Sequence, residues 1–373
     1  MANNKSDYNN IIITGSIAYD EIMDFPKEFK DYFHPEKLHQ INVSFVVDKL
    51  EKQLGGTGTN IAYNISLVLD SRLRGNDKEK MSSRPSETSG EILKKDSSTT
   101  LGMTKEKVEI KLLGSIGKDG KSFLDFFKKN KIDTEGIIVD KKLYTAAGKV
   151  ITDIKDNQIW GFYYGASKSA KKINLKKYCD KSSLLIISAT HSEAFLHFQK
   201  EAIKYKVDYI YDPGMALTWI TDKDLKEGVM NCRYLIGNDY EIAMILKRLN
   251  VSINQFSDTG ICVITTLGEK GVNYNGGVIP VKTGIYGKFS LDSRLRGNDN
   301  SLLVPGYKVK KMVDPTGAGD AWRGGFIAGL VLGMKTLDCL KLGNVMASFA
   351  IEKYGTVNHK PNSKEVEKRM ENL

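Results

Sequence analysis

The sequence has few of the residues that build disulfide, redox or metal centres. Its four cysteines are widely separated, and none belongs to a C-x-x-C pair: Cys179, Cys232, Cys262 and Cys339. This spacing excludes a zinc ribbon and a thioredoxin-like motif. The five histidines show no H-E-x-x-H arrangement, which excludes that class of zinc enzyme.

Long apolar segments are also absent. No stretch approaches 18 apolar residues without a charge, so we expect no transmembrane helix and no membrane partner. The first ten residues are polar and lack the apolar region of a signal peptide. We therefore expect a cytoplasmic protein with reduced thiols.

The charge balance is basic, with 55 Lys and Arg against 45 Asp and Glu and a net charge of +10. A nucleic-acid partner is one interpretation of such a charge. However, no run of five basic residues occurs, and no basic helix is interleaved with aromatics. Scattered charge is typical of a solvated surface, so we expect no nucleic-acid partner.

The order of apolar segments predicts an α/β fold. Short apolar runs at 11–15, 108–116 and 261–266 are typical of buried strands, and helical patterns lie between such runs. This alternation predicts a three-layer domain whose mostly parallel central sheet is covered on both faces. The alternating segment 41–47 and a hairpin over 143–164 predict a separate, smaller sheet.

One internal repeat interrupts this pattern. The sequence LDSRLRGND occurs at 69–77 and again at 291–299. The first copy opens a stretch rich in Ser, Lys, Glu and Thr, a composition that buries little apolar surface. We interpret the segments at about 70–107 and 286–302 as inserted polar loops. A twin arginine-based binding site is the alternative interpretation.

The strongest chemical signal is DPTGAGD at 314–320, followed by the apolar run AWRGGFIAGL. The run predicts a helix, whose free N–H groups and positive dipole end favour an anion. A carboxylate in that turn would repel phosphate, but it suits a base that activates a hydroxyl for attack on phosphorus. We expect the dipole to favour ionised Asp320. The alternative is an aspartate that only caps a core helix.

These residues resemble the C-terminal signature of the ribokinase (PfkB-type) family of carbohydrate and nucleoside kinases, closest to its bacterial adenosine-kinase-like members. Further segments resemble family motifs in the family's order: GSIAYD at 15–20, GGTGTNIA at 55–62, GSIGKDG at 114–120, NDYE at 238–241 and TLGEKG at 266–271. The resemblance covers nearly the whole chain outside the two inserts.

The resemblance implies a role for each motif. Asp320 would be the general base, and backbone amides would hold the migrating phosphoryl at Gly317, Ala318 and Gly319. Sugar hydroxyls would bind at Asp20, Gly56 and Asn60. Asn238 and Glu241 would organise Mg²⁺ through water. The ATP site would also include Thr266, Gly268, Gly271 and Asn344. Taken singly, Asp20 also fits a strand end, Asn60 a helix cap and Glu241 an ordinary first-turn carboxylate.

The resemblance further implies one kinase domain over 1–373, with a small β-sheet lid from about 17–50 and 143–165. It implies ATP and Mg²⁺ as cofactors, and a monovalent cation such as K⁺ in some members. The acceptor would be a small molecule, most specifically adenosine, with a ribose- or fructose-like sugar as the alternative. A monomer and a homodimer both remain open, as does a catalytically inactive binding protein.

Four aromatic residues on the expected small sheet could form a slot for a nucleobase: Phe45, Trp160, Phe162 and Tyr163. Packing within the lid, or at a dimer interface, is an equally good interpretation of them.

A second glycine segment imitates a phosphate-binding loop. Residues 114–122 read GSIGKDGKS, but five residues separate Gly114 from Gly120. The P-loop motif G-x-x-x-x-G-K-[ST] requires four. We therefore interpret Lys121 and Ser122 as an accidental match.

Deletion of residues 72–105 should leave enzymatic activity largely intact, because this polar segment carries none of the motifs above. Steady-state activity of the deletion variant, compared with the full chain, checks this expectation. A variant that folds with an unchanged circular dichroism spectrum but has no activity would contradict it.

Overall fold

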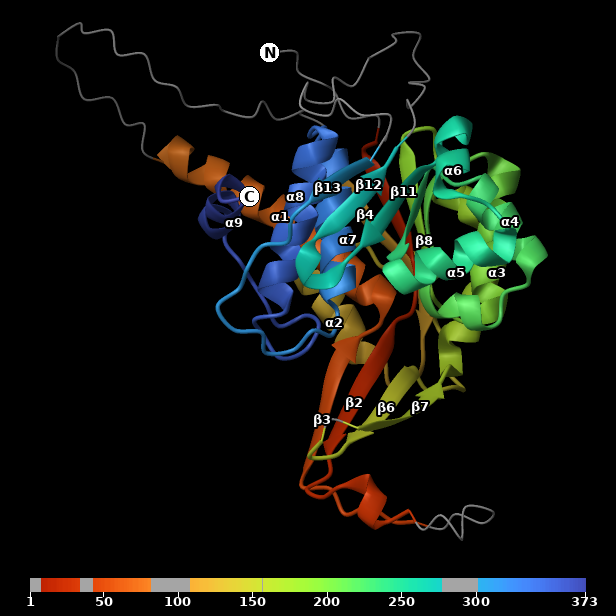
Figure 1. The fold of residues 1–373 in the computed structure, drawn as a ribbon, viewed down its shortest axis with the longest axis vertical. Coiled ribbons are helices and arrows are strands. Elements are labelled where there is room, and N and C mark those ends of the chain that lie inside the picture. The colour runs from red at the N-terminus through yellow and green to blue at the C-terminus, as the bar shows by residue number, and fades with distance from the viewer. Residues whose placement is uncertain (1–7, 34–42, 82–107, 156, 277–300) are drawn as a thin grey trace, which may run out of the picture.

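The computed structural model describes residues 8–33, 43–81, 108–155, 157–276 and 301–373. Within these ranges the chain forms a large sheet between two layers of helices, and a smaller sheet projects from one end (Figure 1). The expected α/β architecture, with a mostly parallel central sheet and a separate small sheet, is confirmed.

The described strands of the large sheet lie in the order β13-β12-β11-β10-β9-β8-β1-β4-β5. All neighbours pair in parallel except β11 with β12 and β12 with β13, which are antiparallel. The bounds are β1 Asn10–Thr14, β4 Glu109–Ile116, β5 Ile137–Val139, β8 Ser183–Ser188, β9 Asp208–Asp212, β10 Tyr234–Asn238, β11 Cys262–Thr266, β12 Val272–Asn275 and β13 Ser301–Val304.

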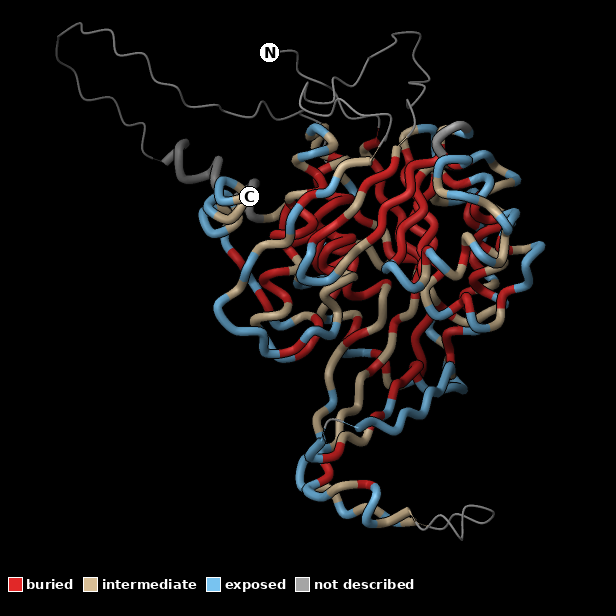
Figure 2. The backbone as a smooth tube through the Cα atoms, in the orientation of Figure 1, coloured by how far each residue is buried: buried red, intermediate tan, exposed pale blue. Residues whose placement is uncertain are grey.

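Alternate residues of the central strands enter two separate apolar cores. Ile11 and Ile13 of β1 face one core, and Ile12 between them faces the other. This alternation follows from the two-residue period of a strand. Both cores appear as buried chain on either side of the sheet (Figure 2).

The first core is covered by α1 (Thr57–Met81), α2 (Lys121–Lys129), α7 (Ala318–Val331) and α8 (Thr336–Ala350). The second is covered by α3 (Ser192–Tyr205), α4 (Asp222–Met230), α5 (Asp239–Leu249) and α6 (Ile253–Thr259). The helix α9 (Ser363–Glu371) packs on α8. Short 3-10 turns occur at Phe29–Asp31, Gly165–Lys172, Leu175–Lys177, Gly214–Thr218 and Gly268–Lys270.

The small sheet has the order β3-β2-β6-β7, with bounds β2 Ala18–Asp24, β3 Lys49–Gly55, β6 Ala146–Thr152 and β7 Gln158–Tyr163. The expected hairpin is β6 and β7. The expected strand over 41–47 is wrong over 43–47, because these residues form no ladder and β3 begins only at Lys49; residues 41 and 42 lie outside the described residues. Instead, the ring of Phe45 packs against Phe25 and Phe29, at centroid distances of 4.8 and 5.1 Å.

The first inserted segment differs from the expected loop. Helix α1 runs on to Met81, so residues 70–81 are helical, while 82–107 lie outside the described residues. This segment mixes good helix formers with Gly75, Asn76 and Asp77, which disfavour a helix, so its helical state depends on extension of a helix that is already nucleated. Of the second insert, residues 301 and 302 belong to β13, and 286–300 lie outside the described residues.

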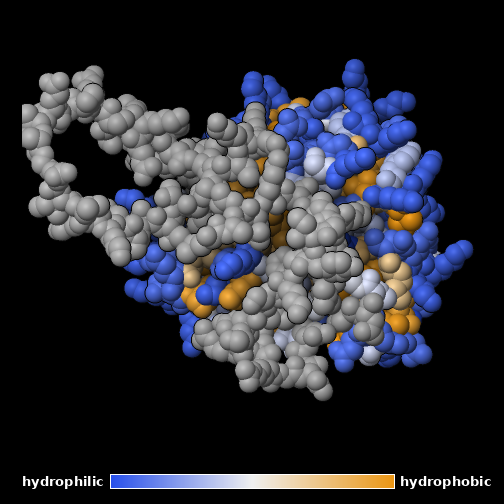
Figure 3. Space-filling view, turned by 90° about the horizontal axis from the view of Figure 1, so that it is seen from above, coloured by the Kyte–Doolittle hydropathy of each residue, from blue (hydrophilic) through white to orange (hydrophobic). Residues whose placement is uncertain are grey.

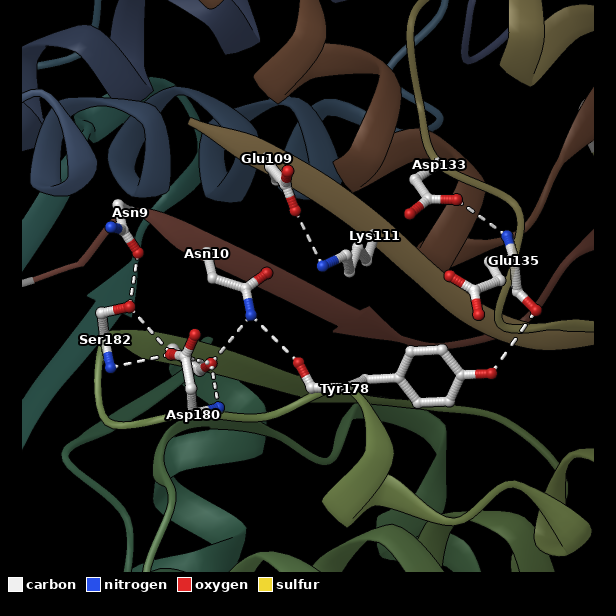
Figure 4. Close-up of polar contacts among 10 residues, drawn as sticks. Asn9, Asn10, Glu109, Lys111, Asp133, Glu135, Tyr178, Asp180 and Ser182 are labelled. Atoms are coloured by element: carbon white, nitrogen blue, oxygen red, sulfur yellow. Dashed lines mark hydrogen bonds and ion pairs between the residues drawn. The ribbon is translucent and has the colours of Figure 1, made fainter. Parts of the chain in front are cut away.

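A polar network closes the amino ends of β1, β4 and β8 (Figure 4). The side-chain amide of Asn10 donates to the carbonyl of Tyr178 at 3.0 Å. The Asp180 carboxylate accepts from the backbone N–H of Ser182 at 2.9 Å, and Lys111 pairs with Glu109 at 2.8 Å. These polar groups satisfy the strand ends that lie opposite the cavity described below.

Helices α1 and α7 approach each other unusually closely. A Cβ atom on Gly324 of α7 would lie 2.3 Å from the Cβ of Asn64 on α1. Four residues earlier on each helix, the Asn60 side-chain amide donates to the Asp320 carboxylate at 2.8 Å. The missing side chain at position 324 therefore allows a polar contact one turn away.

Seen from the end away from the small sheet, the described surface is mainly hydrophilic, with smaller hydrophobic areas (Figure 3). Elsewhere among the described residues, several lysines pair with acidic residues, as Lys177 does with Glu135. Among the described helices, none is both long enough and apolar enough to span a bilayer.

Replacing Gly324 with alanine should destabilise the protein by about 1–3 kcal/mol, because the new methyl group forces α1 and α7 apart. Urea unfolding measures the change. Gly161→Ala is the matched control, since a Cβ at Gly161 would meet no atom within 4 Å. Equal stability losses in the two variants would contradict the close helix contact.

Candidate active site

A cavity of about 610 Å³ opens where the carboxyl ends of the parallel strands face the small sheet. Its wall includes Ser16 after β1, Thr190 after β8, Asp212 ending β9, Asn238 ending β10 and Thr266 ending β11. Ligands of open α/β sheets bind at this edge, near the point where strand order changes direction. Here β1 is that point, because β4 and β8 flank it.

The glycine turn before α7 places Asp320 in this cavity. Gly317 caps the helix with φ of 77°, a conformation that favours glycine. Asp320 lies in the first turn and lines the cavity with Gly317 and Gly319, and Ala318 lies between these glycines. The expected helix after this motif is therefore present, and its amino end faces the cavity.

The Asp320 carboxylate is held by Asn60, whose side-chain amide donates to it. Burial raises the pKa of Asp320, the positive charge of Arg323 and the hydrogen bond from Asn60 lower it, and Glu241 raises it further. The net direction is upward. We expected the helix dipole to favour the ionised form, but the loss of water around the carboxylate outweighs the nearby positive groups.

Asp314 holds the glycine turn in place through two hydrogen bonds to its carboxylate. One carboxylate oxygen accepts from the backbone N–H of Thr316 at 2.9 Å, and the other accepts from the N–H of Gly355 at 2.9 Å. The buried side chain thus ties the glycine turn to the segment that follows α8. The same segment contacts β3, since the Thr356 hydroxyl donates to the carbonyl of Leu54 at 3.3 Å.

Asp20 of β2 reaches the cavity from the small sheet. Its carboxylate folds over Gly55, where a Cβ would lie 2.0 Å from Oδ2. Gly56 next to it has φ of 88° and also lines the cavity. Burial, followed by the charges of Asp320 and Asp314, raises the pKa of Asp20 to about 6. The structure therefore brings Asp20, Gly56, Asn60 and Asp320 together.

Asn238 and Glu241 form a capping box at the start of α5. The Asn238 side chain accepts from the N–H of Glu241 at 2.8 Å, and the Glu241 carboxylate accepts from the N–H of Asn238 at 2.8 Å. These bonds satisfy two free amides of the helix end. Both side chains also line the cavity, so a local structural role and a ligand role coexist here.

The four residues expected at the nucleotide divide into two groups. Thr266 and Gly268 line the cavity, and Gly271 and Asn344 do not. Gly271 has φ of 97° and makes the turn into β12. The Asn344 side chain accepts from the Trp322 ring N–H at 2.9 Å and donates to the Pro305 carbonyl at 2.7 Å. Its polar atoms therefore serve packing between α7, α8 and the chain after β13.

Two charged residues of the site escaped the sequence reasoning. Arg323 follows Asp320 by nearly one turn of α7 and donates to Asp212 at 2.5 Å. Both side chains line the cavity and are buried. A usable signal was present, because the segment YDPG at 211–214 ends a buried strand with an aspartate. No sequence pattern indicates that Arg323 is the partner of Asp212, because the two residues are 111 positions apart.

The wall nearest the small sheet is aromatic. Trp160 and Phe162 of β7 stack with ring centroids 5.4 Å apart and planes 6° apart. Tyr163 lines the cavity as well, and Met215 and Trp219 line it from the segment that follows β9. Met215 and Trp219 were not expected from the sequence. Phe45, which was, packs with Phe25 and Phe29 and does not line the cavity.

The segment that imitates a P-loop, residues 114–122, contributes no residue to the cavity wall. Lys121 and Ser122 begin α2 and are absent from the cavity wall. The Ser122 hydroxyl shares a hydrogen bond of 2.6 Å with the hydroxyl of Tyr19.

The described cavity wall contains many more acidic than basic side chains. Its carboxylates are Asp20, Asp212, Asp239, Glu241 and Asp320, whereas Arg323 is the single cation in this lining. No cluster of three or more His, Cys, Asp or Glu side chains within the described ranges is placed to hold a metal ion directly. The arrangement suits an uncharged polar ligand beside a carboxylate at a helix amino end.

Curated proteins with similar sequences are kinases of small molecules. The chain is 27% identical to a nucleoside kinase of Methanocaldococcus jannaschii over 275 residues, 73% of this chain and 83% of that protein. It is 26% identical to a ribokinase of Lactococcus lactis over 273 residues, 71% of this chain and 80% of that protein.

The fold is also similar to a solved structure, that of Burkholderia thailandensis nucleoside kinase in complex with inosine. The TM-score is 0.73 with 22% identity, and the alignment covers 97% of this chain and 96% of that one. The same enzyme has been solved with ADP-inosine, at a TM-score of 0.69 and 24% identity, covering 97% of this chain and 95% of that one.

The sequence model of the pfkB family of carbohydrate kinases matches residues 99–363 of this chain. The matched region includes α7 and its glycine turn. The match agrees with the resemblance read from the sequence motifs. The chain therefore belongs to the pfkB family of carbohydrate kinases, enzymes that transfer a phosphoryl group to an alcohol.

Proposed function

We propose that this kinase transfers the γ-phosphate of ATP to a primary hydroxyl of a nucleoside, with adenosine as the first candidate. The observation that carries the proposal is the meeting of Asp320, Asn60 and Asp20 in one cavity at the amino end of α7. A carboxylate there can accept a proton from an alcohol, while the helix amides face the incoming phosphate.

The residues divide the transfer between them. Asp320 takes the proton from the acceptor hydroxyl as its oxygen forms a bond to the γ-phosphorus. The bond between that phosphorus and the β–γ bridging oxygen breaks, and ADP leaves. The amides at Gly317, Ala318 and Gly319 stabilise negative charge on the transferred group. Asn60 holds the Asp320 carboxylate in place through its hydrogen bond.

The cavity fits a requirement for Mg²⁺. Its carboxylates outnumber its single guanidinium in the described wall, so a bare triphosphate would be repelled. Asn238 and Glu241 would hold Mg²⁺ through water, which suits an ion that keeps several water ligands. Magnesium would neutralise phosphate charge there. The glycine turn around Asp314 is where K⁺ would bind if this kinase shares that family property.

The same charge balance supports an uncharged acceptor. Arg323 is already paired with Asp212, so no described cation of the wall remains for the phosphate of a sugar phosphate. Vicinal ribose hydroxyls match the amide and carboxylate of Asn60 and Asp20. The stacked rings of Trp160 and Phe162, with Met215 on the same wall, offer an apolar surface for a nucleobase.

The similar proteins support both the nucleotide and the acceptor. Relatives in two organisms are nucleoside kinases, and the Burkholderia enzyme was solved with inosine and with ADP-inosine. A ribose-like sugar is the second candidate, because the Lactococcus lactis relative is a ribokinase. Initial rates with adenosine, inosine, ribose and fructose separate the two. Transfer to free ribose at least as efficient as to either nucleoside would favour the second candidate.

We also propose that residues 1–373 form one kinase domain whose small sheet acts as a lid. The expected segments, about 17–50 and 143–165, require extension to Gly55 so that they include β3. Closure of this sheet over the cavity would exclude water and limit hydrolysis of ATP. Both a monomer and a homodimer are compatible with this function.

Asp320→Asn should lower kcat by roughly 10²–10⁴, the usual effect of losing a positioned base. ATP should still bind, because Asp320 belongs to the acceptor chemistry rather than to the nucleotide contacts. Steady-state kinetics and isothermal titration with ATP measure the two properties. Asp125→Asn is the control, since it removes an exposed carboxylate on α2. An active Asp320→Asn enzyme would remove the basis of the proposal.

Activity should fall as pH decreases through about 6, because Asp20 has a raised pKa of about 6 and Asp320 also has a raised pKa. A protonated Asp320 cannot accept the hydroxyl proton, and a protonated Asp20 accepts fewer hydrogen bonds. In Asp20→Asn the acid limb of kcat/KM should become less steep, and KM should rise roughly tenfold. An acid limb centred near ~4, the ordinary aspartate range, would contradict the raised values.

A further inference from the structure

Arg323 and Asp212 form a buried ion pair in the wall of the cavity. Arg323 lies on α7 and is 8% exposed, and Asp212 at the end of β9 is 3% exposed. One guanidinium nitrogen, Nη2, donates to Asp212 Oδ1 at 2.5 Å. The pair therefore joins the glycine-turn helix to the carboxyl edge of the central sheet.

The rest of the guanidinium lies against the glycine turn. A Cβ on Gly319 would stand 2.8 Å from Nη1, so a larger residue at position 319 would require the guanidinium to shift. The third guanidinium nitrogen, Nε, is buried and has no hydrogen-bond partner among the described residues. A buried N–H of a charged group without a partner is expensive. The position of Arg323 is therefore not explained by its bond to Asp212 alone.

Negative groups surround this guanidinium from several elements. Asp212 comes from β9, Glu241 from α5 and Asp320 from α7, and all three line the same cavity. Asp20 of β2 and the neutral amide of Asn60 of α1 line this cavity as well. Arg323 is thus a fixed positive charge close to three carboxylates, in a cavity that an anionic phosphate donor must enter.

We propose that Arg323, anchored by Asp212, is a positioning residue for phosphoryl transfer that holds a positive charge behind the glycine turn and beside the Asp320 carboxylate. Its charge offsets the carboxylates of the cavity wall. Its packing against Gly319 helps to orient the backbone amides of the glycine turn. This inference rests on the proposed kinase reaction and adds a residue to it.

A purely structural ion pair is the competing explanation. Buried ion pairs are weak sources of stability, and replacing both partners with apolar residues is often neutral or stabilising. A double variant, Arg323→Met with Asp212→Leu, therefore separates the two roles. It removes the charges together and leaves neither partner unpaired, so the fold should persist.

In the double variant, kcat should fall about 10²-fold while KM for the acceptor changes little, as for the loss of one preorganised donor. The acid limb of kcat should move to higher pH, because the charge of Arg323 opposes the rise in the Asp320 pKa. Arg323→Lys keeps the charge and should recover part of the lost kcat, and Asp212→Asn, which loosens the anchor, should also lower kcat.

Arg369→Met is the matched control. Arg369 pairs with Glu352 at 2.6 Å, and neither residue lines the cavity. This variant should lower stability without altering kcat or its pH profile. Urea unfolding of all variants identifies any that are not folded.

The inference is overturned if the folded double variant keeps a kcat within about threefold of the parent enzyme and the same acid limb. The kinase proposal is tested separately, because Asp320→Asn must lose activity whatever Arg323 does. A fully active Asp320→Asn enzyme overturns both. An inactive Asp320→Asn enzyme beside an unimpaired double variant overturns only the role of Arg323.

Discussion

The close packing of α1 on α7 is the contact from which the site follows. Gly324 lies against Asn64, and one turn toward the amino end of both helices Asn60 meets Asp320. The two helices start in chain segments about 260 residues apart, yet their amino ends face one cavity. A larger residue at the crossing would separate the carboxylate from the amide that orients it. The close packing of Gly324 on Asn64 in the core thus determines the distance between Asn60 and Asp320 at the cavity.

The second determinant is the sign of the charge in the cavity. Carboxylates from β2, β9, α5 and α7 converge there, and Arg323 is the cation that the described wall contains. Burial, reinforced by these neighbouring carboxylates, raises the pKa of Asp20 and of Asp320, which suits a base more than a permanently ionised group. The negative charge of the cavity also disfavours a negatively charged acceptor. It favours a phosphate donor whose charge is partly neutralised by a bound cation. One electrostatic property therefore constrains the base, the acceptor and the cofactor together.

The sequence predicts the layers of the fold well, because apolar runs and helical periods are local properties. Strands such as β1, β4 and β11 and the helix after the glycine turn are readable from a few neighbouring residues. The strand assigned to 41–47 fails because Phe45 is recruited by rings that come from another segment. Helix α1 is longer than expected because extending an existing helix costs less than nucleating a new one.

The site was predictable only where a motif is short and contiguous. Asp320, Asn60 and Asp20 came from separate motifs, but the bond between Asn60 and Asp320 depends on how two helices cross. The pairing of Arg323 with Asp212 and the upward shift of the Asp320 pKa depend on burial, which no local pattern reports. The bonds of the Asn344 amide to Trp322 and Pro305 likewise depend on how distant segments pack, which its sequence neighbours do not indicate. Helix α1 also has a directional consequence: only its first turn serves the cavity, and its other end lies roughly 35 Å away. A change of length at that distal end is therefore remote from the chemistry, and a single helix combines an end that serves the site with an end that does not.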